Sequence, residues 1–279
     1  MTWTGQSTLP SPGLRRYVRA FAQRNAMDAS MEQRMPAYLE TVLHFDFGDL
    51  LTVHSPGGRY GARRRSIVGP HTRGGVSLRF DGDIDTFAIF LQPSALWYLF
   101  RVPVSDLMEA HYDADDVIGN GASRLWNTLA ATTDFNRRVE IAEQFLAPYA
   151  GRAARGTTIS SAATILAREG GRITVPGLAS RVQLSVRQLE RSFIREIGIT
   201  PKRFARVARF QAALDARVTA PHRSWLEIAT ETGYFDQMHL IHEFQSLGGS
   251  PPTNTLKHLG DSRPDALAAS HEQDTRAQA

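Results

Sequence analysis

Hydrophobic positions follow the same order twice in the C-terminal half of the chain. In the first copy, Leu178-Ala179 begins an apolar run that ends at Phe193. In the second copy, Ile228-Ala229 leads through a Gly233-Tyr234 turn to Phe244. The ends of the run are 15 positions apart in one copy and 16 in the other, so the second copy has one extra turn residue. This pattern predicts two helix-turn-helix units, which would read two neighbouring major-groove segments of DNA.

Each copy also carries helix start signals. Ser185 followed by Gln188, and Ser224 followed by Glu227, have the spacing of a capping box. Asp236 is suited to cap the second helix of the second copy. We therefore expect the reading helices to begin directly after Ser185 and Asp236.

A longer helix is predicted between the two copies. Thr200-Pro201 supplies a cap followed by proline at the first helical position, and an apolar stripe continues to about Arg217. At 1.5 Å per residue this helix would be roughly 25 Å long. Such a rod would set the distance between the two units. A further amphipathic helix is expected over Thr158–Arg168.

The N-terminal half shows short segments rich in β-branched and aromatic residues, separated by turns of Gly, Pro and Asp. The predicted strands are Tyr38–Phe47, Ser66–Val68, Gly75–Phe80 and Thr86–Leu91. From Pro93 the period changes to that of helices, which we expect around Leu96–Phe100, over Ala122–Ala131 and over Phe135–Tyr149. The strand spacing favours a small antiparallel barrel or sandwich.

These elements predict an α+β chain with an N-terminal β-barrel or sandwich that carries helices. An all-α domain of two helix-turn-helix subdomains joined by a long helix follows it. We place the N-terminal domain at 1–150, a DNA-binding domain at 151–260 and a disordered polar tail at 261–279. Ala150–Gly156, rich in small residues and arginine, is the expected linker.

Charge is distributed unevenly over the 279 residues. Residues 1–150 hold 15 Lys/Arg and 16 Asp/Glu, whereas residues 151–260 hold 15 and 8. The basic surplus therefore lies with the repeated units, where it favours binding to a polyanion. The chain has no cysteine, which excludes thiolate catalysis and Cys-ligated metal sites. With no apolar run long enough to cross a bilayer and no signal-peptide pattern, we expect a cytoplasmic protein without membrane contact.

Polar side chains at the start of each reading helix are candidates for base contact. Arginine can pair with guanine O6 and N7, and glutamate can accept from cytosine N4. Glutamine suits adenine, and methionine suits the thymine methyl group. The candidates are Arg187, Glu190 and Arg191 in the first helix, and Gln237, Met238 and His242 in the second. An ordinary surface ion pair between Arg187 and Glu190 is the alternative in the first helix.

The ordered pair of motifs resembles the DNA-binding domain of the AraC/XylS family of bacterial transcriptional regulators. Its first part is Leu178-Ala179, Ser185, Leu189-Glu190-Arg191, Phe193 and Gly198-Ile199-Thr200-Pro201. Its second part is Ile228-Ala229, Gly233-Tyr234, Asp236-Gln237, His239-Leu240, Phe244 and Gly249-Ser250-Pro251-Pro252. The resemblance covers about 100 residues and implies that the third and sixth helices of the domain enter successive major grooves, with contacts from the six candidates above.

Two positions depart from this family's pattern. His242 stands where the family often has arginine, and Leu247-Gly248 replaces a charged residue and an aromatic. We therefore expect the second unit to contact mainly phosphate or to bind more weakly than the first.

The resemblance also implies the partners of the chain. They are promoter DNA, RNA polymerase, a small-molecule effector and a second copy of the chain, with activation and repression both open. The length and element order of residues 1–150 resemble the effector-binding or dimerisation domain, often a cupin-like barrel, that precedes the DNA-binding domain in this family. The resemblance therefore implies such a domain at 1–150.

Two other functions are weighed against a regulator. A barrel containing His44, His54, His71 and His111 is also compatible with a metal-dependent cupin-type enzyme that has an accessory DNA-binding module. His44 and Asp46 share a strand face, but the closely spaced His-x-His pattern of such sites is absent, and we expect neither catalysis nor a metal or cofactor. The other alternative is an architectural protein that binds DNA without sequence preference.

Overall fold

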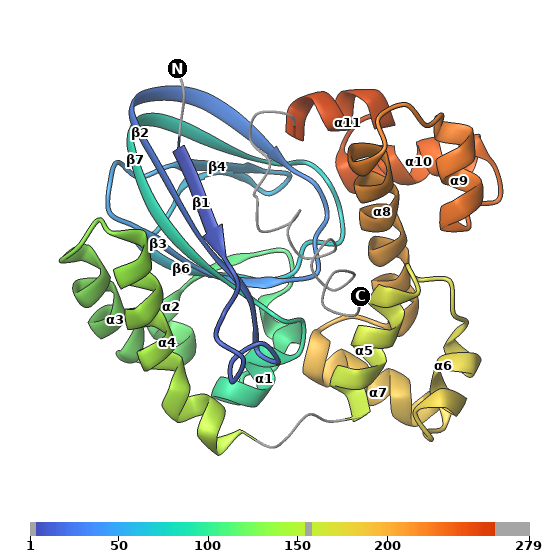
Figure 1. Ribbon diagram of the computed structural model, residues 1–279, viewed down its shortest axis with the longest axis horizontal. Helices are drawn as coiled ribbons and strands as arrows, with labels where there is room; N and C mark the ends of the chain where they lie inside the picture. Colours follow the sequence, from blue (N-terminus) through green and yellow to red (C-terminus); the bar gives the residue numbers. More distant parts are fainter. Residues whose placement is uncertain (1–3, 154–157, 260–279) are drawn as a thin grey trace.

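The computed structural model describes residues 4–153 and 158–259. Within these residues, an antiparallel sheet with four α-helices and a 3₁₀ turn forms the N-terminal part, and seven helices form the C-terminal part beside it (Figure 1). This order of elements confirms the predicted fold class. Within the described residues, no helix is long and apolar enough to span a membrane.

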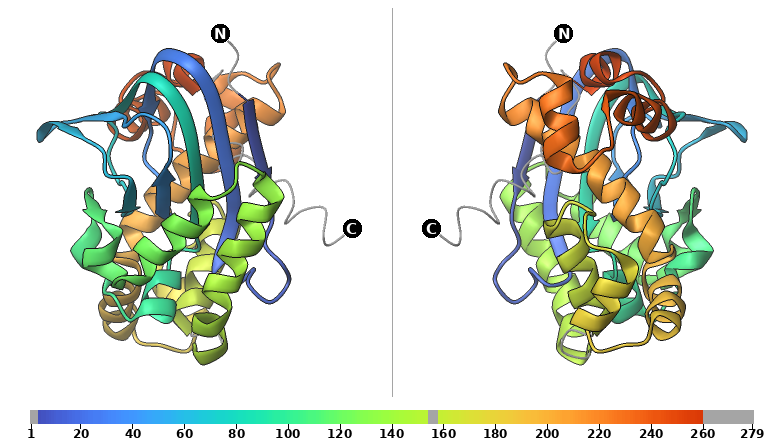
Figure 2. Two further views of the ribbon diagram at one scale, coloured as in Figure 1. Left: turned by 90° about the vertical axis from the view of Figure 1, so that its left-hand side faces the viewer. Right: turned by 90° about the vertical axis from the view of Figure 1, so that its right-hand side faces the viewer.

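The sheet has eight strands in the order β1-β2-β7-β3-β6-β8, with β4 paired to β7 and β5 paired to β4. The strands are β1 (Thr4–Thr8), β2 (Val18–Met35), β3 (Thr41–Asp46), β4 (Thr52–Ser55), β5 (Gly58–Gly61), β6 (Arg65–Val68), β7 (Val76–Leu91) and β8 (His111–Asp113). Figure 2 shows the β4–β5 hairpin extending away from the rest of the sheet, with its turn at Pro56-Gly57 as the sequence predicts.

Strand β7 organises the sheet. One of its edges pairs with β2 along its whole length, while the other edge pairs first with β4 and then with β3. The prediction of two strands, Gly75–Phe80 and Thr86–Leu91, is therefore wrong. Asp81-Gly82 does not turn the chain but stays paired with Ala29 and Ser30 at an irregularity in β2, so a single strand passes through.

Two further strand predictions need correction. The segment Tyr38–Phe47 is a strand only from Thr41, because Tyr38 pairs separately with His71. The long strand β2 was not predicted at all. Its middle, Arg24–Ser30, contains one Asn, one Asp and two Ala, which are poor strand formers in isolation, and it is held here by pairing to β7.

Helices cover one face of the sheet (Figure 1). They are α1 (Ala95–Phe100), the 3₁₀ turn η1 (Val104–Leu107), α2 (Ala114–Ile118), α3 (Gly121–Ala130) and α4 (Phe135–Arg152). Leu43, Phe45 and Phe87 pack against them, while Val42 and His44 point to the other face, because side chains alternate along a strand. The fully buried Arg138 on α4 pairs with Asp85 at 2.5 Å and so fastens α4 to β7.

The three helices predicted in this half are confirmed, but α4 was expected to end at Tyr149 and continues to Arg152. The Arg152 guanidinium donates to the Pro148 carbonyl at 3.1 Å in this last turn. The first part of the predicted linker Ala150–Gly156 is therefore helical. Its last residues, and the predicted tail 261–279, lie outside the described residues.

The C-terminal helices share one hydrophobic core. They are α5 (Thr158–Arg168), α6 (Val175–Arg181), α7 (Val186–Ile197), α8 (Pro201–Thr219), α9 (Trp225–Thr232), α10 (Gln237–Gly248) and α11 (Pro252–Leu259). Helix α5 and the long helix α8 confirm the sequence predictions, with Thr200 capping α8. Ala37 and Leu39, from the segment between β2 and β3, belong to the same core and join the two parts of the molecule.

Gly171, after α5, lets that helix approach the backbone of α8. A Cβ atom there would lie 1.9 Å from the Ala205 carbonyl oxygen, and its φ of +68° is also unfavourable for other residues. Gly170 has a similar φ of +55°, but a Cβ atom there would meet only the Ala212 methyl group at an ordinary 3.5 Å.

We expect Gly171→Ala to destabilise the chain by about 2–4 kcal/mol, because backbone strain and a steric clash add. The neighbouring Gly170→Ala should cost only about 1–2 kcal/mol from strain alone. Chemical unfolding of the two variants measures the difference. Equal losses would contradict the close approach of α5 and α8.

Candidate nucleic-acid interface and interior pocket

The first helix-turn-helix unit consists of α6 and α7. Ser185 caps α7 and forms the predicted capping box, in which its hydroxyl accepts from the Gln188 backbone N–H and the Gln188 side chain accepts from the Ser185 N–H. Leu189, Phe193 and Ile197 are fully buried against the core. The exposed face therefore carries mainly polar side chains, together with the exposed Val186 in the first turn and Ile194.

The second unit consists of α9 and α10. Ser224 and Glu227 form the predicted capping box at the start of α9, and Asp236 accepts from the His239 backbone N–H at the start of α10. Leu240 and Phe244 are fully buried. As in the first unit, local capping and the helical period determine which face is exposed.

All six predicted base-contact residues are exposed. Arg187, Glu190 and Arg191 lie on the outer face of α7, where no ion pair joins Arg187 to Glu190 in the described structure. Gln237, Met238 and His242 lie on the outer face of α10, and Met238 is 56% exposed despite being apolar. The folded chain leaves these side chains available to a ligand.

Helix α8 holds the two units at its two ends (Figure 1). The Phe204 ring meets Phe193 of the first unit edge-on at 5.4 Å, and the Phe210 ring meets Phe244 of the second unit at 4.8 Å. The Arg206 Nε–H also donates to both carboxylate oxygens of Glu243, each at 2.8 Å. Both reading helices are thus packed directly on one rod.

The C-terminal end of α7 contacts the N-terminal part of the molecule, residues 4–153, which contains the sheet and is called the sheet domain below. The Tyr98 hydroxyl on α1 donates to the buried Glu196 carboxylate, and the Arg195 guanidinium lies over the Trp97 ring at 5.6 Å. Gly198, which ends α7 at a φ of +90°, lies against Val104 and Met108 so closely that a Cβ atom would clash.

The C-terminal end of α10 is held in the same way by a different part of the sheet domain. The Ala37 backbone N–H donates to the Leu247 carbonyl at 2.7 Å, and the Gly74 N–H donates to the Ser246 carbonyl at 3.0 Å. The last four backbone carbonyls of a helix have no N–H partner within the helix. The Ala37 and Gly74 N–H groups therefore supply two of these missing hydrogen bonds. The sheet domain therefore contacts the far end of both reading helices.

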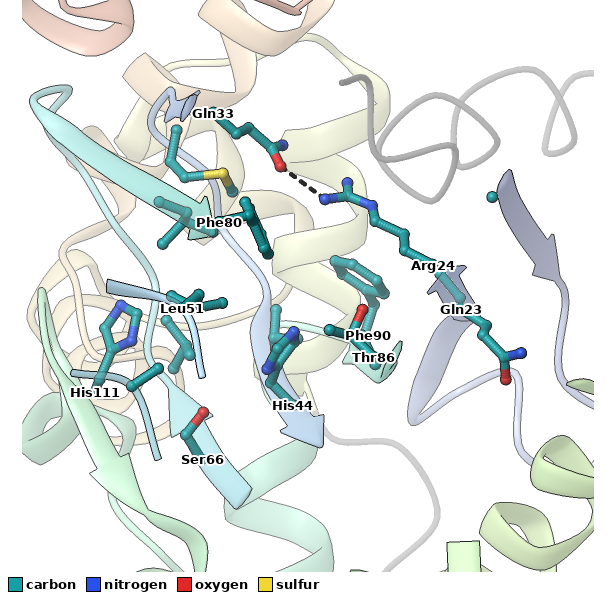
Figure 3. Close-up of a pocket in the computed structure, with 18 of the residues that line it drawn as sticks. Gln23, Arg24, Gln33, His44, Leu51, Ser66, Phe80, Thr86, Phe90 and His111 are labelled. Carbon is teal, nitrogen blue, oxygen red and sulfur yellow. Dashed lines mark hydrogen bonds between the residues drawn. The ribbon is translucent and has the colours of Figure 1, made fainter. Parts of the chain in front are cut away.

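An interior pocket lies on the face of the sheet opposite α1–α4 (Figure 3). Its cavity volume is about 110 Å³ and most of its lining is apolar, including Leu51, Phe80 and Phe90. Arg24 donates to Gln33 at 2.7 Å on one side, and His44 and His111 lie away from this pair. The pocket thus combines apolar walls with separate polar groups.

The four histidines considered as metal ligands do not form one site. His44 and His111 line the pocket, His71 packs edge-on against His111 at 5.9 Å, and His54 lies apart on β4. His44 contacts Asp46 at 3.2 Å, as their shared strand face predicts. Within residues 4–153 and 158–259, no group of three His, Cys, Asp or Glu side chains is arranged to hold a metal ion.

Burial, nearby charges and hydrogen bonds shift the pKa values of His111 and the ionisable side chains around it. Burial, together with the charges of His71 and His44, lowers the pKa of His111 to about 4. Burial also raises the pKa of Tyr38, with Glu109 and Tyr60 acting in the same direction. For Glu109, burial opposes ionisation, but hydrogen bonds from His71 and Thr72 outweigh it and lower the pKa to about 2. At neutral pH the lining group His111 is uncharged.

Arg24 and Gln33 in the pocket were not among the sequence candidates. They lie on β2, whose polar composition gives no strand signal in the sequence. The sequence therefore does not show that both side chains line the same side of the sheet. In the sequence, the apolar Val18, Ala20 and Phe21 at the start of β2 give a short strand-like signal, but this signal ends before Arg24.

Comparison with known proteins agrees with the geometry of the two units. Residues 178–258 match the model of a helix-turn-helix domain of the AraC type. The chain carries an AraC-type DNA-binding domain. This finding confirms the resemblance seen in the sequence and supports a DNA-binding transcription regulator.

The N-terminal half, residues 6–113, matches a domain of unknown function (DUF6597). Of the curated proteins, none matches the chain. Among solved structures, ToxT from Vibrio cholerae is similar with a TM-score of 0.48 and 10% identity, over 92% of this chain and 99% of ToxT. A second ToxT structure, bound to (E)-4-(8-methylnaphthalen-1-yl)but-3-enoic acid, has a TM-score of 0.49 and 10% identity, over 93% of this chain and 100% of ToxT.

The low pKa of His111 predicts a pH-dependent stability. Between its ordinary value of 6.5 and about 4, the unfolded chain binds a proton at this position that the folded chain does not. Stability should therefore fall as the pH falls through this window. Glu109 has a lowered pKa, so its stabilising contribution is lost only at lower pH, from its ordinary 4.5 towards 2.

We expect the thermal midpoint of the native chain to fall more between about pH 7.5 and 5.5 than that of His111→Gln, which cannot take up this proton. His222→Gln, at an exposed position, is the matched control and should behave like the native chain. A His111→Gln variant with the native pH profile would contradict this assignment.

Proposed function

We propose that this AraC-type regulator reads two adjacent major-groove segments of promoter DNA with the exposed faces of α7 and α10. Arg187 and Arg191 pair with guanine, Glu190 accepts from cytosine, and Gln237 pairs with adenine. Met238 contacts a thymine methyl group, and His242 contacts a base or a phosphate. The observation that supports this reading is that both helices bury one face on α8 while all six side chains remain exposed.

Electrostatics supports DNA as the ligand. The sequence places seven more basic than acidic residues in 151–260, whereas residues 1–150 are nearly neutral. Lys202 and Arg203, at the start of α8, are exposed beside the first unit and are suited to phosphate. The N-terminal ends of α7 and α10 add the positive end of the helix dipole.

The same proposal assigns effector binding to the interior pocket. The apolar walls favour a molecule that is mostly apolar, and the Arg24 guanidinium favours an acidic or hydrogen-bond-accepting group on it. The chain acts without catalysis or a cofactor. It works in the cytoplasm, at a promoter in contact with RNA polymerase, as an activator or repressor and as a homodimer or a single copy.

A direct path links the pocket to α10. Met35, Tyr38 and Val76 line the pocket, and they lie within two residues of Ala37 and Gly74, whose backbone N–H groups bind the end of α10. A molecule that displaces these lining residues shifts the donors as well. For control of DNA binding, the molecule must bind differently to the DNA-competent and incompetent states.

Selection of bound duplexes from a random pool tests this function. A regulator should prefer its selected site over random duplex by about 10³-fold or more at physiological salt. The selected sites should contain two conserved segments about one helical turn apart. Enrichment of no sequence would instead identify an architectural protein that binds DNA generally.

Variants assign each segment to its helix. Arg191→Ala should cost about 1–3 kcal/mol on the selected site and relax the preference at one position in one segment. Gln237→Ala should do the same in the other segment. Arg137→Ala, an exposed arginine on α4, removes the same charge elsewhere and is the control. Equal losses on selected and random duplex would assign Arg191 to phosphate.

A thermal-shift panel of small organic acids and their neutral analogues tests the pocket. A ligand at 100 times its Kd should stabilise the native chain by about 2.7 kcal/mol. Arg24→Met should lose the preference for the acid over its neutral analogue. Arg79→Met, which removes an exposed arginine paired with Asp81, should keep it. An acid that stabilises the native and Arg24→Met chains equally would place its binding outside this pocket.

A further inference from the structure

The two helix-turn-helix units can be aligned residue by residue through their turns. In the first unit the Leu184 N–H donates to the Ala179 carbonyl at 2.9 Å, and in the second the Tyr234 N–H donates to the Ala229 carbonyl at the same distance. Leu184 is followed directly by the cap Ser185, whereas Tyr234 is separated from the cap Asp236 by one residue. The extra turn residue of the second unit is therefore Phe235.

Phe235 has no packing role in the fold. An apolar residue just before a helix cap commonly packs on the fourth helical residue, here Leu240. Leu240 is fully buried, yet Phe235 is 92% exposed, because Tyr234 is turned inward in its place and is only 5% exposed. The Tyr234 ring contacts the His239 ring edge-on at 5.2 Å. The phenyl ring of Phe235 thus remains in solvent.

The backbone around Phe235 is held in place. Its N–H donates to His239 Nδ1 at 3.4 Å, and the His239 N–H donates to Asp236 Oδ1 at 2.7 Å. The Asp236 carboxylate next to it is therefore occupied as a helix cap. A fixed turn presents an exposed aromatic ring at the N-terminal end of the second reading helix, where Met238 is also exposed.

We propose that Phe235, together with Met238, forms an apolar contact with thymine methyl groups in the DNA segment that α10 reads. This inference rests on the proposed function, since it requires α10 to lie in the major groove. Thymine is the only one of the four bases that presents an apolar group on the major-groove edge. In the sequence, Gln237 lies between Phe235 and Met238, and its amide suits the adenine of an A·T pair.

The two units then differ in what they select. Arginine and glutamate on α7 suit G·C pairs, whereas Phe235, Gln237 and Met238 suit A·T pairs. The departure of His242 from arginine does not leave the second unit without sequence preference, because methyl contacts replace the arginine contact. Continuity of Phe235 with the exposed face of α10 favours DNA over a protein partner as its occupant.

Deoxyuridine substitution tests the contact directly, because it removes the thymine methyl group and leaves the base-pairing edge unchanged. The duplex selected by the native full chain is prepared with each thymine of the second segment replaced in turn. At one or two positions the native chain should lose affinity by roughly fourfold per methyl group, the size expected for burying one such group. Replacements in the first segment should have smaller effects.

Phe235→Ser should bind the selected duplex more weakly, bind random duplex as the native chain does, and lose the sensitivity to deoxyuridine at the thymine that Phe235 contacts, while any sensitivity due to Met238 remains. Phe235→Leu should keep part of that sensitivity, since it retains an apolar side chain. Leu226→Ser, at a 55% exposed apolar position on α9, is the matched control and should bind as the native chain does. Equal thermal midpoints of the three variants and the native chain verify that the fold is unchanged.

The outcomes separate this inference from the function on which it rests. If the native chain selects no duplex, the proposed function itself is wrong. If it selects a site, but Phe235→Ser keeps the native affinity and deoxyuridine sensitivity, the methyl contact is refuted. Equal loss on selected and random duplex would likewise refute it, by assigning Phe235 to the sugar-phosphate backbone.

Discussion

The packing of two aromatic pairs on one helix is the constraint on which the rest of the C-terminal half depends. Phe204 and Phe210 of α8 each meet a phenylalanine from one reading helix, Phe193 in α7 and Phe244 in α10. Because buried side chains are close-packed, neither reading helix can move far along α8 without opening a cavity. The separation of the two units is therefore a property of this core rather than of flexible linkers.

The two ends of each reading helix have different roles. Their N-terminal ends are exposed and carry the polar side chains, while their C-terminal ends contact the sheet domain through Glu196 and through the carbonyls of Ser246 and Leu247. The sheet domain therefore contacts both helices at the ends opposite to the exposed polar side chains. In the function proposed above, a shift of the sheet domain would move both helices without covering those side chains.

Strands β2 and β7 serve both the pocket and these contacts. Their paired residues form much of the pocket wall, and the segments at Ala37 and Gly74 lie just beyond the ends of the two strands. The polar residues of β2 are tolerated because cross-strand partners satisfy them, as Asn25 does by donating to Asp85 at 3.1 Å. One long antiparallel pair thus supplies the binding cavity and the tether to α10.

Local rules in the sequence were enough for the C-terminal half. Capping residues such as Ser185 and Thr200, the glycine after α7 and the helical period of apolar positions act within one or two turns, so they determined the helices and the exposed faces of α7 and α10. Only the tertiary structure decided the course of β2 and β7, the pocket at Arg24 and the exposure of Phe235. Strand pairing joins residues as distant as Val18 and Leu91, and the buried Tyr234 ring lies 5.8 Å from the Arg209 guanidinium of α8, whereas Phe235 is exposed. Such contacts between distant segments leave no periodic signal in the chain itself.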